Sequence, residues 1–193
     1  MDISIQKSKL LNHQEIQITG SKSESNRLLL LKALYPEIKI ENLSNSDDSV
    51  LMQRALVSND NIIDIHHAGT AMRFLTAYLS IQNGKEVTIT GSSRMKERPI
   101  KASKLEAGLE LTLKGKITSL PYIEMTLSLL NQVGIDTSFV ENTIVVKPNF
   151  SVLKPQTLTV ESDWSSASYF YSLIALSEIG TEITIASYKK ESL

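Results

Sequence analysis

Cysteine is absent from the 193-residue sequence, and histidine is scarce, with only three residues. Without cysteine the chain has no disulfide bond, no thiol nucleophile and no thiolate ligand for a zinc or iron–sulfur site. Three histidines give little basis for a metal site built from imidazoles alone. The composition therefore predicts no metal centre, and we expect no cofactor.

An excess of charge of either sign is also missing, because 20 Lys and Arg residues face 21 Asp and Glu residues, which leaves a net charge of −1. The longest apolar run, Leu28–Leu31, is far shorter than the ~20 residues that cross a bilayer. The first residues contain no apolar signal core. These features disfavour a polybasic nucleic-acid-binding protein and a membrane protein. We expect a cytoplasmic protein with neither nucleic acid nor a membrane as its partner.

The remaining composition, 41% hydrophobic and 21% charged, is that of an ordinary globular chain. One organisation recurs four times along it. A short alternating segment ends at small polar residues, and an apolar segment of helical length follows. The copies start at Ile16, Ile63, Leu111 and Leu158, and their nearly even spacing predicts an internal structural repeat.

Shorter segments between these copies predict further strands and one more helix. Gly84, Gly134 and Gly180 stand where the preceding helices should stop. Residues 51–57 predict a helix that is entered through an Asp/Ser cap at 46–49. Alternating helices and strands indicate a mixed α/β fold. Period-2 apolarity and β-branched residues predict strands at 38–43, 86–90, 135–139, 143–147 and 181–185.

Two of the predicted helix entrances have the composition of anion-binding sites. Residues 20–27, Gly-Ser-Lys-Ser-Glu-Ser-Asn-Arg, supply hydroxyls, an ammonium group and a guanidinium group. Residues 68–73, Ala-Gly-Thr-Ala-Met-Arg, add a glycine that lets a ligand approach the backbone. A helix N-terminus offers unpaired N–H groups and the positive end of the helix dipole to an oxyanion. The alternative is that these residues are ordinary helix caps with solvated cations.

A third basic cluster, Arg94-Met-Lys-Glu-Arg-Pro99, follows the predicted strand at 86–90. Such a cluster is often only a solvated face. Pro99 restricts Arg98 to an extended conformation, which places Arg98 at the end of a strand. A guanidinium there is suited to two-pronged binding of phosphate or carboxylate.

Residues 20–27, 68–73 and 94–99 together resemble the enolpyruvyl transferases, within them the branch that acts on shikimate 3-phosphate. Weaker similarity continues through residues 119–122 and 163–170. The resemblance implies transfer of the enolpyruvyl group from phosphoenolpyruvate to the 5-hydroxyl of shikimate 3-phosphate, with release of phosphate. It also implies a monomer without cofactors.

The fold implied by the resemblance is a pair of α/β lobes of repeated β-α-β-α-β-β units, an inside-out α/β barrel. Residues 1–19 and 161–193 would form part of a first lobe, and residues 20–160 a second lobe. Carried over by position, Lys22 would be the catalytic residue and would contact both substrates. Shikimate 3-phosphate would also contact Ser23, Arg27, Ser119 and Tyr122, phosphoenolpyruvate would also contact Gly69, Thr70 and Arg98, and Arg73 would support the phosphoenolpyruvate loop.

The chain departs from this family pattern in several places. His67 stands where the family usually has Asn, and Phe74 where Pro is common. After Ile100 a whole repeat unit is missing, and the acidic general acid/base residues of the family would come after Leu193. The competing hypothesis is therefore a non-catalytic anion-binding fragment or scaffold. On that hypothesis, we expect the 193-residue chain to bind phosphate-bearing ligands weakly and to turn nothing over.

Overall fold

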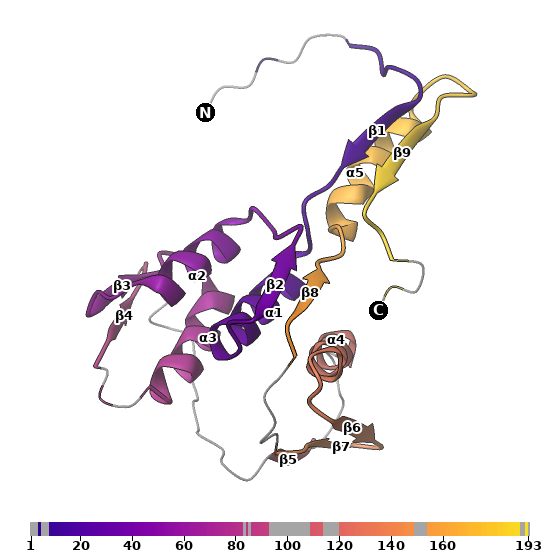
Figure 1. Ribbon diagram of the computed structural model, residues 1–193. Helices are drawn as coiled ribbons and strands as arrows, with labels where there is room; N and C mark the ends of the chain where they lie inside the picture. Colours follow the sequence, from indigo (N-terminus) through magenta and orange to yellow (C-terminus); the bar gives the residue numbers. More distant parts are fainter. Residues whose placement is uncertain are drawn as a thin grey trace.

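The computed structural model describes residues 4, 8–82, 84, 86–92, 109–113, 120–148, 154–189 and 192. Helices and strands alternate along this part of the chain (Figure 1), which confirms the predicted α/β class. In chain order the elements are β1 (Gln14–Gln17), α1 (Lys22–Leu34), β2 (Ile38–Glu41), α2 (Asp47–Val57), β3 (Ile62–Asp64), α3 (Gly69–Ser80), β4 (Thr88–Thr90), β5 (Leu109–Thr112), α4 (Leu120–Gln132), β6 (Thr137–Val140), β7 (Thr143–Val146), β8 (Gln156–Thr159), α5 (Trp164–Ala175) and β9 (Ile183–Ala186).

All four predicted strand–helix units are present: β1–α1, β3–α3, β5–α4 and β8–α5. Each helix starts within or next to its polar entrance, earlier than the apolar run alone indicates. Lys22 and Gly69 are thus the first residues of α1 and α3. Lys22, Ser23, Gly69 and Thr70 therefore lie in the first turns of these helices, where backbone N–H groups lack helical partners, and Arg27 and Arg73 lie one turn further along.

The remaining elements overlap the predicted segments, although the bounds of each differ by a few residues. Helix α2 begins at Asp47, inside its predicted entrance, because Ser46 occupies the cap position. The Ser46 side chain does not cap the helix, and its hydroxyl donates to Ser49 Oγ instead. Strand β4 is shorter than predicted and covers only Thr88–Thr90. The predicted stop after α4 is present, since Gly134 has a φ of 91° and Ile135 N donates to Leu130 O across it.

The described strands form four small sheets. The pairs β1–β9, β2–β8 and β3–β4 are parallel, and β5, β7 and β6 form an antiparallel sheet in that order. Helix α1 contacts α2, α3 and α4 as well as strand β2 (Figure 1). It thus joins the other helices of this body to the β2–β8 pair. None of the described helices has the length and apolarity needed to cross a membrane.

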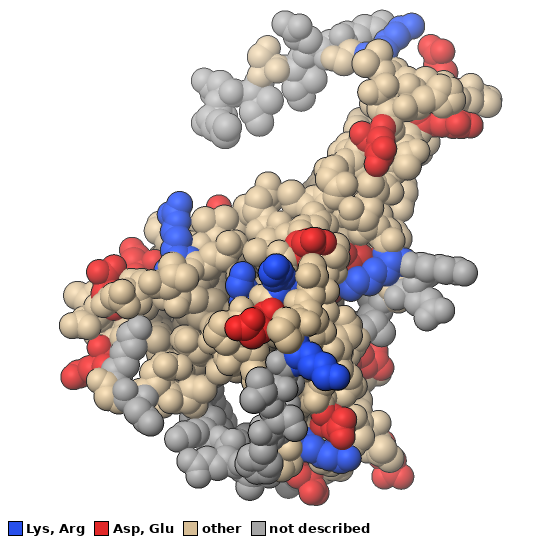
Figure 2. Space-filling model, viewed as in Figure 1, with Lys and Arg blue, Asp and Glu red and all other residues tan. Residues whose placement is uncertain are grey.

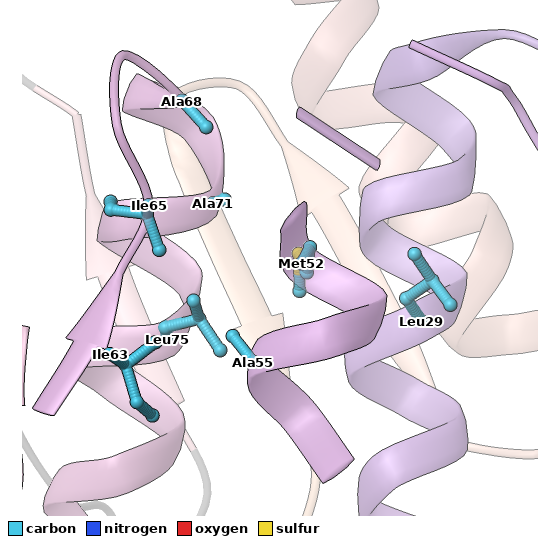
Figure 3. Packing of buried hydrophobic residues seen from close by; sticks show 8 residues of the cluster. All are labelled: Leu29, Met52, Ala55, Ile63, Ile65, Ala68, Ala71 and Leu75. Carbon is cyan, nitrogen blue, oxygen red and sulfur yellow. The ribbon is translucent and has the colours of Figure 1, made fainter. Parts of the chain in front are cut away.

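Helix α1 lies between two hydrophobic clusters because Leu28, Leu29 and Leu31 point in different directions around its axis. Leu29 packs with residues of α2, β3 and α3, among them Met52 and Leu75 (Figure 3). Leu28 and Leu31 pack on the other side with residues of β2 and α4. Complete burial of a leucine side chain contributes roughly 1.5–3 kcal/mol, so the leucine run fixes α1 between its neighbours.

Helix α5 and the β1–β9 pair form an arm at one end of the molecule (Figure 1). The chain passes between the arm and the helical body twice, and the two passages run side by side. Gly20 and Ser162 form an antiparallel bridge. Ser21 N donates to Glu161 O at 2.7 Å, and Asp163 N donates to Thr19 O at 3.0 Å. This bridge lies beside the start of α1.

Candidate functional site

A cleft of about 910 Å³ opens where the first turn of α1 meets the two passages, and we call it the central cleft. Its lining comes from the starts of α1, α3, α4 and α5 and from the loop at 44–46. Six of the nine predicted site residues lie along it: Lys22, Ser23, Arg27, Thr70 and Tyr122, which were predicted to bind substrates, and Arg73, which was predicted to support the phosphoenolpyruvate loop. These residues come from three helices that are far apart in the sequence.

Of the other three predicted site residues, the structure describes only Gly69, which does not line the cleft. Gly69 is buried at the first position of α3, next to Thr70. Arg98 and Ser119 lie outside the described residues, as does the rest of the basic cluster at 94–99. Among the described residues, the two predicted helix entrances meet at the cleft, because Lys22 and Arg27 of α1 and Thr70 of α3 all line it.

Arg27 has the most restricted side chain of the three cations in the cleft. Its Nε donates to Thr126 Oγ1 at 2.7 Å, and its Nη1 donates to Ser23 O at 2.8 Å. Both acceptors are neutral, and Arg27 forms no ion pair with another described residue. Burial lowers the pKa of Arg27 from its usual value, and the Tyr122 phenol opposes this shift to a smaller extent. A half-buried cation without a carboxylate partner favours an anionic ligand.

At the α3 entrance the structure differs from the simple expectation of free backbone N–H groups. Asp48 Oδ1 accepts from Thr70 N at 3.2 Å and from Ala71 N at 3.5 Å. The Asp48 carboxylate thus caps α3, which has no capping side chain of its own at Ala68. Of the first N–H groups of α3, that of Gly69 has no hydrogen-bond partner among the described residues.

Three carboxylates also line the cleft, those of Glu24, Glu161 and Asp163. Glu24 Oε2 accepts from Glu161 N at 3.0 Å, and Glu24 Oε1 accepts from Lys189 Nζ at 2.8 Å. Asp163 Oδ1 accepts from Ser166 N and caps α5. Because these carboxylates already have internal donors, they compete little with a ligand for the cations of the cleft. Figure 2 shows acidic and basic side chains interspersed on one face of the molecule.

Glu24, Asp48 and Glu161 also belong to the site, although they were not predicted from the sequence. The spacing from Ser21 to Glu24 is that of a capping box, in which the glutamate reaches back to the start of its own helix. Glu24 instead accepts from the distant Glu161 and Lys189.

Near α3, His67 Nε2 lies 3.5 Å from Asp47 Oδ2. Within the part of the chain that the structure describes, no group of three or more metal-ligating side chains is present.

The comparisons with known proteins agree on one family. The family described as EPSP synthase (3-phosphoshikimate 1-carboxyvinyltransferase) matches residues 53–105 and 101–193. A 3-phosphoshikimate 1-carboxyvinyltransferase of Bacteroides fragilis (strain YCH46) is 36% identical over 217 residues, covering 84% of this chain and 52% of the relative. One of Actinobacillus pleuropneumoniae serotype 5b (strain L20) is 31% identical over 265 residues, covering 93% and 60%.

The fold comparison gives the same result. A solved structure described as EPSP synthase from Acinetobacter baumannii superposes with a TM-score of 0.70 at 15% identity, covering 95% of this chain and 58% of that chain. This likeness confirms the predicted fold class. The chain spans about half the length of the two Bacteroides fragilis relatives that it matches. From the matched residues and the identity to its relatives, the chain belongs to the EPSP synthase family.

Proposed function

We propose that the central cleft binds shikimate 3-phosphate and phosphoenolpyruvate, and that the whole protein transfers the enolpyruvyl group from the second to the first. The observation that carries this proposal is Arg27, whose half-buried guanidinium has only neutral internal acceptors in a cleft also lined by Lys22 and Arg73. Both substrates carry several negative charges. A cationic site offsets their mutual repulsion when they are brought together.

In the proposed reaction, the 5-hydroxyl oxygen of shikimate 3-phosphate forms a bond to C2 of phosphoenolpyruvate, while C3 takes up a proton. The hydroxyl loses its proton in this step. The tetrahedral adduct then loses a proton from C3, the bond from C2 to the phosphate oxygen breaks, and inorganic phosphate leaves. Lys22, at the first position of α1, would contact both substrates.

The remaining roles follow the resemblance of the sequence. Ser23, Arg27 and Tyr122 would hold shikimate 3-phosphate, together with Ser119. Gly69 and Thr70 would hold phosphoenolpyruvate, together with Arg98, and Arg73 would support their loop. The Gly69 N–H supports this assignment, because it is a backbone donor next to the cleft and has no hydrogen-bond partner among the residues that the structure describes. We also infer that residues 20–160 form one lobe and that residues 1–19 and 161–193 belong to the other, with the bridged passages at Gly20 and Ser162 as the boundary. A cytoplasmic monomer remains the expectation.

Calorimetric titration of the 193-residue chain with shikimate 3-phosphate tests the binding assignment. We expect Arg27→Gln to weaken binding about ten- to a hundredfold, the loss of a hydrogen bond between charged groups. Arg54→Gln is the matched control, because Arg54 is exposed in the last turn of α2 and does not line the cleft. Equal binding by the Arg27 and Arg54 variants contradicts the assignment. Binding without turnover in the presence of phosphoenolpyruvate favours the non-catalytic alternative for this chain.

A further inference from the structure

Two aromatic rings enclose the guanidinium group of Arg27. Its Cζ atom lies 5.7 Å from the centroid of the Phe74 ring and 5.8 Å from that of the Tyr122 ring. Arg27 belongs to α1, Phe74 to α3 and Tyr122 to α4. Three helices that supply the cleft therefore meet at one cation, at distances where ring faces attract a guanidinium group.

The hydrogen bonds of Arg27 restrict the guanidinium group further. Thr126 Oγ1 accepts from Arg27 Nε and donates to Tyr122 O at 2.7 Å, so the threonine hydroxyl links the cation to the backbone of α4. Ser23 O holds Nη1. A guanidinium group has five N–H donors, and these two bonds use two of them. The other donors, including both on Nη2, have no hydrogen-bond partner among the described residues and are left for a ligand in the cleft.

We propose that Phe74 is a positioning residue, which holds the Arg27 guanidinium against Tyr122 so that its unused N–H groups face the anionic substrate. This inference rests on the proposed function of the cleft. Phe74 lies one turn after Thr70 on α3, and both line the cleft. The contact thus ties the helix that would hold phosphoenolpyruvate to the cation that would hold shikimate 3-phosphate. A proline, common at this position in the family that the sequence resembles, has no aromatic face to offer.

The test compares Phe74→Leu, which removes the ring, with Phe74→Tyr, which keeps it. We expect Phe74→Leu to weaken shikimate 3-phosphate binding about three- to tenfold and Phe74→Tyr to bind within about twofold of the unchanged chain. Phe139→Leu is the matched control, because Phe139 is also half-buried but lies on β6, away from the cleft. If Phe74→Leu fails to fold by circular dichroism, Phe74→Met serves in its place.

Two readouts separate positioning from a general loss of stability. In an Arg27→Gln background, the Phe74 substitution should cause no further loss of binding, and an undiminished loss there overturns the proposal. The side-chain Hε resonance of Arg27 in the free protein should carry a ring-current shift that Phe74→Leu reduces and Phe74→Tyr retains. If Phe74→Leu leaves the Arg27 Hε resonance unchanged, the proposed positioning role of Phe74 is overturned, whether or not shikimate 3-phosphate binds. If the unchanged chain binds no shikimate 3-phosphate, the proposed function fails, while this resonance still decides whether Phe74 positions Arg27.

Discussion

The ion pair between Glu24 and Lys189 gives the sharpest stability prediction. The Glu24 side chain is only 7% exposed and lies 2.8 Å from Lys189 Nζ, whose side chain is 42% exposed. Its second carboxylate oxygen accepts from Glu161 N at 3.0 Å. Among the described residues, Lys189→Met would leave this buried carboxylate with one backbone donor and no opposite charge within ion-pair distance. The bond joins the first turn of α1 to the segment that follows β9.

The expected cost is about 2 kcal/mol of unfolding free energy. Removing one partner of a fully buried ion pair costs about 3–5 kcal/mol, whereas a hydrogen bond to a charged group contributes about 1.5–3 kcal/mol. Lys189 is partly exposed, so water can replace part of its interaction with Glu24. The expected loss of unfolding free energy is therefore that of a hydrogen bond to a charged group, about 1.5–3 kcal/mol.

The assay is urea unfolding followed by the fluorescence of Trp164, which is the single tryptophan of the chain. Its indole N–H donates to Glu161 Oε1 at 3.1 Å, so the probe lies beside the ion pair. Lys9→Met is the matched control, because the Lys9–Glu178 pair spans 3.8 Å with side chains 85% and 91% exposed. Such exposed pairs contribute about 0–1 kcal/mol.

Equal destabilisation by Lys189→Met and Lys9→Met would refute the reasoning. A double-mutant cycle gives a second check. Combining Glu24→Gln with Lys189→Met should cost less than the two single changes added together, because both remove the same interaction. Strict additivity would mean that the two groups do not stabilise each other in solution.

Two further predictions concern stability at the bridged passages. Gly20→Ala should lower the unfolding free energy by about 3 kcal/mol, because a Cβ atom there would lie 1.9 Å from Asn42 O. At Gly84 an added Cβ atom would meet no other atom within 4 Å, but the backbone φ is +70°. Gly84→Ala should therefore lower the unfolding free energy by only about 1 kcal/mol, measured by thermal unfolding. Equal losses of unfolding free energy at Gly20 and Gly84 would contradict this reasoning. Burial, with smaller contributions from neighbouring acidic groups, raises the pKa of Tyr188 above its usual value. The contribution of neutral Tyr188 to the unfolding free energy is therefore complete below about pH 10 and is lost as the pH rises through the raised pKa. Above that pH, the unfolding free energy should fall more steeply for the unchanged chain than for Tyr188→Phe. Parallel curves of unfolding free energy against pH for the two proteins would refute this prediction.

The strand–helix units and the cleft cations could be predicted because their signals are local. A run such as Leu28–Leu31, following Gly, Ser and Lys, marks the start of a helix within a few residues. The same residues carry the chemistry of an anion site. For this reason Lys22, Arg27 and Thr70 were found as candidates from the sequence, and the structure brings them to one cleft.

The contacts that hold this cleft were not predictable, because they join residues far apart in the chain. The aspartates in the first turn of α2 indicate a role at the start of their own helix, yet Asp48 caps α3. Glu24 has the spacing of a capping box but binds Lys189. In both cases a short polar side chain has a local and a distant partner available, and only the packing of the helices decides between them. Phe74 was noted only as a departure from a family pattern, since nothing in the sequence places it against Arg27.

The pairing of β1 with β9 has a consequence for the order in which the chain can fold during synthesis. Gln14 is made early, yet its register partner is Ile183, near the other end of the chain. Domains generally fold as units while the chain emerges, and α1, α2 and α3 can pack against one another through local contacts. The residues of β1 must meanwhile remain unpaired until α5 and β9 have been made. Among the described elements, the arm is therefore completed after the helical body, and nascent chains halted before Ile183 should have a protease-sensitive segment at 14–17.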